Sequence, residues 1–247
     1  ARAQLSAIFP ELSQRDIDHY ITEMWDNLGR TMAEYPHLDT IARTRVTVDD
    51  RAHITHDPGF FDHPALFIAG HFANWEVAGP AFLAQTNTPI HLVYRPANNP
   101  FVDALMTRFR SLNGALRTLA KSRGGMRAIL EGLENNQKIG LLIDQKYTEG
   151  IIADFFGHPA SSTTIYAQLG QRFHCPVYPA QVVRTGGARF HITIHPPLAL
   201  FDKVGTPRRA EDVVAEVHAM MFDWARAHPG QWLWVHQRWP KGTIARG

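Results

Sequence analysis

Apolar residues along the chain follow two alternating spacings, one typical of helices and one typical of buried strands. Short apolar runs predict strands over 65–69, 90–94, 139–143, 177–183 and 190–194. Apolar residues three or four positions apart predict helices over 17–28, 75–85, 100–112, 126–133, 165–173 and 213–224. The first helix follows Ser13, which forms a capping-box pattern with Asp16.

Strands that alternate with helices indicate an α/β fold, with a largely parallel central sheet flanked by helices on both faces. No repeat or long linker divides the chain, so we expect residues 1–247 to form a single domain. In such folds ligands bind at the carboxyl ends of the strands. Because His71, Arg95 and Asp144 each follow a predicted strand, we expect them near the site.

Composition and charge narrow the class of protein. Hydrophobic residues make up 45% of the 247 positions and charged residues 19%, which excludes a disordered chain. The single cysteine, Cys175, excludes an internal disulfide, a cysteine-based zinc site and an iron–sulfur cluster. A formal charge of +2 is too small to indicate nucleic acid as a partner, but it suits an anionic ligand or lipid surface.

Membrane attachment by this stretch of sequence would have to be peripheral. No apolar run reaches the roughly 18 residues that a spanning helix needs. The chain begins at Ala1 rather than at Met, so we expect that an upstream segment, able to hold a membrane anchor, is missing from this sequence.

The segment Gly-His-Phe-Ala-Asn-Trp-Glu at 70–76 is the strongest candidate for chemistry. With Asn74 capping the next helix, His71 stands in a loop and Glu76 in the first turn, where the helix dipole favours a carboxylate that can reach back to the imidazole. A histidine held by a carboxylate is a general base. No serine or cysteine nucleophile stands nearby, so the base would act on a substrate hydroxyl. The alternative is a loop histidine that makes only local hydrogen bonds.

Motifs along nearly the whole chain resemble the lipid A biosynthesis acyltransferases, within the glycerolipid acyltransferase superfamily and its H-x4-[D/E] signature. The matching blocks occur in the family's order at 8–12 (Ile-Phe-Pro-Glu-Leu), 70–76, 93–100 (Val-Tyr-Arg-Pro-Ala-Asn-Asn-Pro), 142–145 (Leu-Ile-Asp-Gln), 155–160 (Phe-Phe-Gly-His-Pro-Ala) and 232–239 (Trp-Leu-Trp-Val-His-Gln-Arg-Trp). One departure is Lys146-Tyr147, where other members often carry an acidic residue.

The resemblance implies transfer of a fatty acyl group from acyl carrier protein to a hydroxyl of a lipid A precursor, without a cofactor or metal. The resemblance also implies that the enzyme acts at the cytoplasmic face of the bacterial inner membrane, in contact with an anionic membrane surface. His71 would deprotonate the hydroxyl, and Glu76 would orient the imidazole and balance its charge. Backbone N–H groups at the Asn74 helix start, together with Arg95, are candidate donors to the oxyanion.

Further side chains are candidates for substrate binding. Arg95 suits bidentate phosphate binding, and its alternative role is an ion pair with Asp144. Asp144 and Gln145 would hold Arg95 or a substrate hydroxyl, or brace the fold. Arg127, with Lys121 and Arg123, forms a basic cluster that is either an anion site at a helix start or a solvated surface.

Aromatic and histidine-rich segments have two interpretations each. Phe155-Phe156 could line an acyl channel or belong to the core, and Trp232, Trp234 and Trp239 could form an interfacial belt or a packed sheet edge. Histidines at 53, 56, 63, 191 and 195 have spacings that a metal could use, but no Asp or Glu accompanies them at a standard motif spacing, which favours solvent-facing or hydrogen-bonded histidines.

Other classes of function stay open on the sequence. A related enzyme could acylate another glycolipid or a phospholipid. A metal-dependent hydrolase would use His71 and Glu76 as metal ligands, and a non-catalytic lipid- or carrier-binding protein would need neither.

Overall fold

The computed structural model, which describes residues 1–240 and 242–244 apart from the side chain of Arg123, centres on one seven-stranded sheet. Its strands, in spatial order, are β1 (Val46–Asp50), β9 (Arg189–Ile194), β8 (Val177–Gly186), β2 (Ala65–Ala69), β5 (Lys138–Leu142), β3 (Ile90–Tyr94) and β4 (Thr118–Ala120). Neighbouring strands are parallel except for β8 and β9, which pair antiparallel. The predicted α/β fold with a largely parallel sheet is therefore confirmed.

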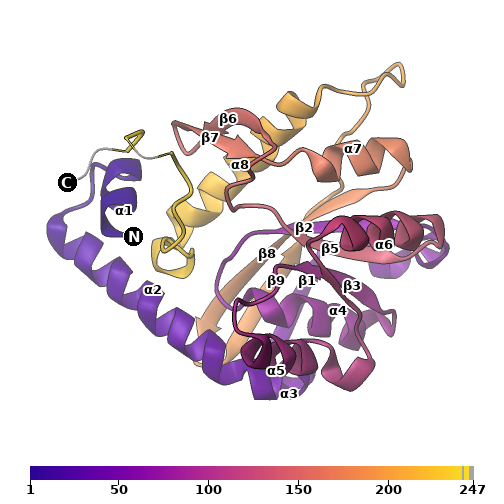
Figure 1. Ribbon diagram of the computed structural model, residues 1–247, viewed down its shortest axis with the longest axis horizontal. Coiled ribbons are helices and arrows are strands. Elements are labelled where there is room, and N and C mark those ends of the chain that lie inside the picture. Colours follow the sequence, from indigo (N-terminus) through magenta and orange to yellow (C-terminus); the bar gives the residue numbers. More distant parts are fainter. Residues whose placement is uncertain (241, 245–247) are drawn as a thin grey trace.

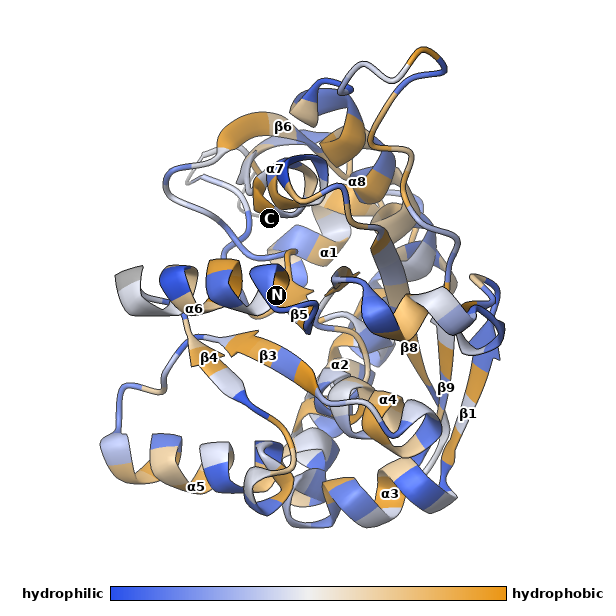
Figure 2. Ribbon diagram, turned by 90° about the vertical axis from the view of Figure 1, so that its right-hand side faces the viewer, coloured by the Kyte–Doolittle hydropathy of each residue, from blue (hydrophilic) through white to orange (hydrophobic). Residues whose placement is uncertain are grey.

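The helices lie in two layers, one on each face of the sheet, as Figure 2 shows. One layer contains α6 (Arg123–Glu134), α7 (Ile165–Arg172) and α8 (Ala210–Ala227), and the other contains α3 (Leu38–Thr44), α4 (Ala78–Thr86) and α5 (Pro100–Arg110). Side chains alternate along β2, so that Leu66 and Ile68 join the first core and Ala65 and Phe67 the second.

Two N-terminal helices and a small hairpin complete the structure. α1 (Arg2–Ile8) lies beside the C-terminal segment, and Gln4 donates a hydrogen bond to the carbonyl of Trp234 (Figure 1). α2 (Gln14–Glu34) is a long helix that begins at Ser13, where the predicted capping box with Asp16 is present. β6 (Ile151–Phe155) and β7 (His158–Ser162) pair antiparallel outside the main sheet.

Each predicted strand is present, with bounds that differ from those of the structure by a few residues at most. The structure adds β1, β4 and the β6–β7 pair, which carry polar residues or are only a few residues long and so lack a continuous apolar run. The helix predicted over 75–85 begins as the 3₁₀ turn η4 (Trp75–Val77) and continues as α4. Pro80 lies in the first turn of α4, where a missing N–H costs no hydrogen bond.

Strand register brings the candidate residues to one edge of the sheet. β2 pairs with β5 so that Ala69 lies opposite Leu142, and the N–H of Ile143 donates to the carbonyl of Ala69. The residues that follow both strands, His71 and Asp144, are therefore neighbours. β3 lies on the other side of β5, which brings Arg95 to the same edge.

The aromatic residues of the C-terminal segment are part of the core. Trp232, Trp234 and Trp239 are at most 2% exposed, and Phe155 and Phe156 stack on each other beside them. Of the two alternatives, the interfacial belt is therefore wrong, because these indoles pack on one another and on Phe155 and Phe156. Phe155 and Phe156 likewise belong to the core rather than to an acyl channel. In the part of the chain that the structure describes, no helix combines the length and apolar character needed to cross a bilayer.

Candidate active site

His71 and Asp144 form a hydrogen-bonded pair in the loops after β2 and β5. Nδ1 of His71 donates to Oδ1 of Asp144 at 2.6 Å, and the backbone N–H of His71 donates to Oδ2 at 2.8 Å. A Cβ at Gly70 would lie 3.3 Å from Oδ2 of Asp144 and 2.9 Å from the Phe72 ring. The missing side chain at Gly70 therefore permits the close approach of the two loops.

Asp144 is held as a carboxylate although it is only 3% exposed. Burial acts to raise the pKa of Asp144, but the charge of His71 and the hydrogen bonds from His71 and Trp232 outweigh it and lower the pKa to about 2. An ionised Asp144 fixes the proton of His71 on Nδ1. Nε2 of His71 then carries the lone pair, as a general base requires.

Glu76 contacts Arg110, Tyr35 and Trp75 rather than His71. Nε and Nη2 of Arg110 donate to the two carboxylate oxygens at 2.7 Å each, and the Tyr35 hydroxyl donates at 2.7 Å. Trp75 Nε1 donates to the same carboxylate at 3.0 Å. The predicted contact between Glu76 and the imidazole is therefore wrong, because the permanent cation of Arg110 engages both oxygens of Glu76.

The Glu76–Arg110 pair is buried, with each residue 7% exposed. Burial acts to raise the pKa of Glu76, but the hydrogen bonds and charge of Arg110 lower it overall. Burial, together with the charge of Glu76, raises the pKa of Tyr35. This group is consequently a fully ionised ion pair with a neutral phenol, and none of its members is poised to exchange a proton.

Helix α2 supports the loop after His71 through the backbone of Ala73. Ala73 is fully buried with φ of 48°, a left-handed conformation that costs about 1 kcal/mol or more for a residue other than glycine. Its carbonyl accepts from Asn27 Nδ2 at 2.9 Å and from Thr31 Oγ1 at 3.2 Å, and its N–H donates to the carbonyl of Gln231 at 2.8 Å. These hydrogen bonds hold the loop in the shape that presents His71.

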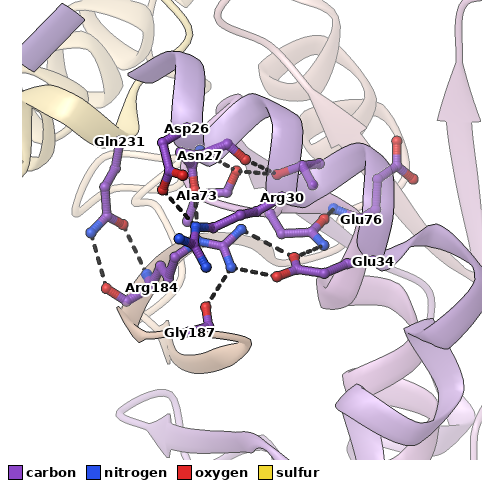
Figure 3. Close-up of polar contacts among 11 residues, drawn as sticks. Asp26, Asn27, Arg30, Glu34, Ala73, Glu76, Arg184, Gly187 and Gln231 are labelled. Atoms are coloured by element: carbon purple, nitrogen blue, oxygen red, sulfur yellow. Dashed lines mark hydrogen bonds and ion pairs between the residues drawn. The ribbon is translucent and has the colours of Figure 1, made fainter. Parts of the chain in front are cut away.

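A second ion pair extends this support, as Figure 3 shows. Nη1 and Nη2 of Arg184 donate to the carboxylate of Glu34 at 2.5 and 3.1 Å, and Nε donates to Asn27 Oδ1 at 2.8 Å. Glu34 in turn accepts from Asn74 Nδ2 at 2.8 Å. Asn74 caps η4 as predicted, by accepting from the N–H of Glu76 at 3.1 Å. Its fully buried side chain does not line the cavity, so it positions the loop instead of binding substrate.

Gln145 lies between two imidazoles. Its Nε2 is 3.1 Å from Nε2 of His71 and 2.7 Å from Nε2 of His236. The two imidazole rings have centroids 5.7 Å apart, and the Trp75 ring contacts His71 edge-on at 4.9 Å. Burial, followed by the charge of His71, lowers the pKa of His236. His236 belongs to the matching block at 232–239, but the sequence assigned it no role, because it lies 91 residues after Gln145 in an irregular segment.

A cavity of about 570 Å³ extends from His71 into the α4 side of the molecule. Its polar end contains side chains from the carboxyl edge of the sheet, namely His71, Arg95, Lys121, Gln145, Tyr147 and His236. The remainder is lined mainly by apolar residues, among them Phe67, Ala69, Phe82, Leu92, Ala180 and Ile192. A polar end beside a long apolar wall suits an amphiphilic ligand.

The cationic candidates separate into two groups. Arg95 and Lys121 line the cavity, and burial followed by the charge of Arg95 lowers the pKa of Lys121. Both Asp144 oxygens are bonded to His71 and Trp232, and no ion pair among the described residues links Arg95 to Asp144, so that alternative is wrong. Arg127 does not line the cavity.

Arg127 lies on the surface of α6. Its side chain is 83% exposed and donates to Glu131 one turn along at 2.8 Å. The solvated-surface alternative therefore describes Arg127 better than the predicted anion site does. The side chain of Arg123, a further member of the predicted cluster, lies outside the described residues.

No three His, Cys, Asp or Glu side chains gather as metal ligands within the described ranges 1–240 and 242–244. The supporting groups that the sequence did not reveal are Tyr35, Arg110, Glu34, Arg184 and Trp232. Each is distant in sequence from the partner it meets, by 34 residues for Arg110 and Glu76 and by 88 for Trp232 and Asp144. Local spacing carries no signal for such contacts.

Comparison with known protein families finds a match. The model of the bacterial lipid A biosynthesis acyltransferases matches residues 1–241, which is nearly the whole chain. No curated protein matches the sequence.

Proposed function

Since the chain belongs to the bacterial lipid A biosynthesis acyltransferases, we propose that it transfers a fatty acyl group from acyl carrier protein to a hydroxyl of a lipid A precursor. The observation that carries the proposal is the His71–Asp144 pair at the polar end of an apolar cavity. That arrangement supplies a base of defined tautomer next to space for a long acyl chain.

Proton transfer by His71 is the first step of the proposed reaction. Nε2 of His71 removes the proton of the acceptor hydroxyl while Asp144 stabilises the imidazolium that forms. The hydroxyl oxygen attacks the thioester carbonyl, and a tetrahedral intermediate forms. Its collapse breaks the carbon–sulfur bond, and the imidazolium returns the proton to the leaving thiolate. No acyl-enzyme is needed.

Glu76 has an indirect part in this scheme. Its ion pair with Arg110 joins the turn after the His71 loop to α5, and so Glu76 holds the loop without touching the imidazole. Asp144 thus acts on the base, and Glu76 acts on the fold around it.

Different parts of the cavity would bind different parts of the substrates. The apolar wall would take a fatty acyl chain, since its residues offer no hydrogen bonds. Arg95 and Lys121 would bind phosphate, either of the lipid acceptor or of the carrier's phosphopantetheine arm.

A lipid surface is the proposed partner of α5, because this helix flanks the polar end of the cavity. Phe101, Val102 and Leu105 on α5 are 85%, 45% and 53% exposed, although apolar. Exposed Arg95 and Arg108 lie close to them in the chain. Apolar side chains beside cations match an anionic bilayer surface of the kind found at a cytoplasmic membrane face.

The decisive experiment is an acyl-transfer assay. Purified protein is incubated with a panel of acyl carrier protein thioesters and a tetra-acylated lipid A precursor, with phosphatidylinositol mannoside as an alternative acceptor, and products are read by mass spectrometry. We expect a product one acyl chain heavier from the lipid A precursor, and none with His71→Ala. Transfer only to the alternative acceptor, or full activity of His71→Ala, would contradict the proposal.

A further inference from the structure

The amide of Gln145 has two hydrogens and two imidazole acceptors. With Nε2 of Gln145 at 3.1 Å from Nε2 of His71 and 2.7 Å from Nε2 of His236, one hydrogen points to each ring. Both imidazoles must then be unprotonated at Nε2. For His71 this agrees with the proton that Asp144 holds on Nδ1.

Donors to an oxyanion are scarce elsewhere in the His71 loop. Most backbone N–H groups of this loop already have acceptors inside the protein, including those of His71, Phe72, Ala73, Glu76 and Val77. Of the predicted donors at the Asn74 helix start, the N–H groups of Glu76 and Val77 are used in this way. The Gln145 amide, by contrast, is bonded to the one atom that must be released when the acceptor hydroxyl binds.

We propose that Gln145 donates the catalytic hydrogen bond to the thioester oxyanion, and that His236 positions Gln145 for this task. The proposal rests on the acyl-transfer function above. When the acceptor hydroxyl binds Nε2 of His71, it replaces the Gln145 amide there. The second amide hydrogen stays on His236, so the freed hydrogen remains beside the reacting carbon.

The steps balance with the groups present. The hydroxyl proton moves to Nε2 of His71, the new carbon–oxygen bond forms, and the carbonyl π electrons move to the oxygen, which accepts the freed N–H of Gln145. Collapse restores the carbonyl, breaks the carbon–sulfur bond and returns the proton from His71 to the thiolate. Gln145 then rebinds Nε2 of His71.

His236 serves as an acceptor because it is neutral. The charged or titratable groups that act on it are His71, Asp144 and Arg95, and burial is the largest influence that keeps its pKa low. Protonation of His236 would place an N–H against the amide N–H of Gln145 and would release the amide. His236 therefore acts through Gln145 and is a positioning residue.

A double-mutant cycle tests this coupling. Gln145→Met removes the donor at similar volume, and we expect kcat to fall by about 10²–10³-fold with the donor KM nearly unchanged. His236→Phe should lower kcat by about tenfold. In the double variant kcat should equal that of Gln145→Met alone, because His236 has no other route to the reaction.

His191→Phe is the matched control. His191 is a half-buried histidine on β9 with one side-chain hydrogen bond, to Thr47, and it does not line the cavity. It should leave kcat unchanged, and all variants should keep wild-type melting temperatures within a few degrees. A Gln145→Met enzyme with kcat within threefold of wild type, or a further loss on adding His236→Phe, would overturn the inference.

A substrate-free measurement separates this inference from the proposed function. In ¹⁵N NMR spectra of the free protein, His71 and His236 should both be Nδ1–H tautomers, and Gln145→Met should shift both Nε2 signals. If either ring carries its proton on Nε2, Gln145 cannot donate to both and the inference fails, whatever substrate the wild-type enzyme uses.

Discussion

Two buried carboxylates, Glu76 and Asp144, lie close to His71, and their partners differ in one decisive respect. Glu76 is bound by the guanidinium of Arg110, a permanent cation, whereas Asp144 is bound by the imidazole of His71, a type of group that can accept a proton and return it. The guanidinium has no lone pair that could accept a proton, whereas the imidazole has one on Nε2. An ion pair with a fixed charge stabilises a shape, while a pair with a titratable partner can take part in proton transfer.

Proximity in sequence is a poor guide to which carboxylate serves the base. Glu76 is five residues from His71, whereas Asp144 is 73 residues away yet makes the 2.6 Å hydrogen bond. The structure therefore places Asp144 against the imidazole of His71, the proposed base, and places Glu76 in the ion pair that supports the surrounding loop.

Replacing Asp144 by Asn removes the carboxylate that holds the His71 proton, and we expect it to lower the reaction rate more than any other change described below. The amide can donate to Nδ1 of His71, which moves the ring proton to Nε2 and removes the base, so we expect kcat to fall by on the order of 10⁴-fold. Because the pKa of Asp144 is about 2, protonation of Asp144 should not contribute to any loss of wild-type activity between pH 7 and pH 4.

Replacing Glu76 by Gln removes the ion pair with Arg110, and we expect it to lower stability more than the reaction rate. Arg110 would keep its charge in a buried site without a carboxylate, which costs about 3–5 kcal/mol of unfolding free energy. Denaturant unfolding measures this loss, and Tyr35→Phe, which keeps the ion pair, should cost less. At a temperature where the variant is folded, kcat should stay within about tenfold of wild type. A stable Glu76→Gln protein with a 10³-fold lower kcat would instead make Glu76 the orienting carboxylate.

The strands, and the edge of the sheet at which their ends meet, could be predicted from the sequence. Which side chains contact one another at that edge could not. The apolar runs of β2, β3 and β5 are local signals, and the rule that ligands bind beyond parallel strand ends located His71, Arg95 and Asp144. Whether Asp144 meets His71 or Arg95 depends on register and on Trp232, which approaches from the far end of the chain. For the same reason the sequence could not decide whether the indoles form an interfacial belt or a packed edge.

Replacing Arg95 by Lys tests whether Arg95 binds phosphate in the cavity or supports the fold. Arg95 lines the cavity and does not brace Asp144, so the change should leave the melting temperature unaltered. Loss of the planar fork should weaken phosphate binding by about 1.5–3 kcal/mol, seen as a raised KM for one of the two substrates. A lowered melting temperature with an unchanged KM would indicate a structural role instead.

Replacing Phe101 by Ser tests the membrane surface and has the smallest expected effect. Loss of its partial insertion should weaken binding to anionic vesicles by about 1–2 kcal/mol in a sedimentation assay. Val204→Ser is the matched control, because Val204 is also 85% exposed but lies in the loop before α8. Wild-type binding should weaken as salt is raised. Equal losses of vesicle binding for both variants, or no vesicle binding by the wild-type chain at low salt, would show that α5 does not bind the membrane surface.

Proton NMR of the His71 Nδ1–H resonance shows whether Asp144 or Glu76 holds the proton of His71. A short hydrogen bond to a buried carboxylate shifts this proton far downfield and protects it from exchange. We predict a low-field signal in the wild-type protein and in Glu76→Gln, and its loss in Asp144→Asn. A signal that persists in Asp144→Asn and disappears in Glu76→Gln would show instead that Glu76 holds this proton.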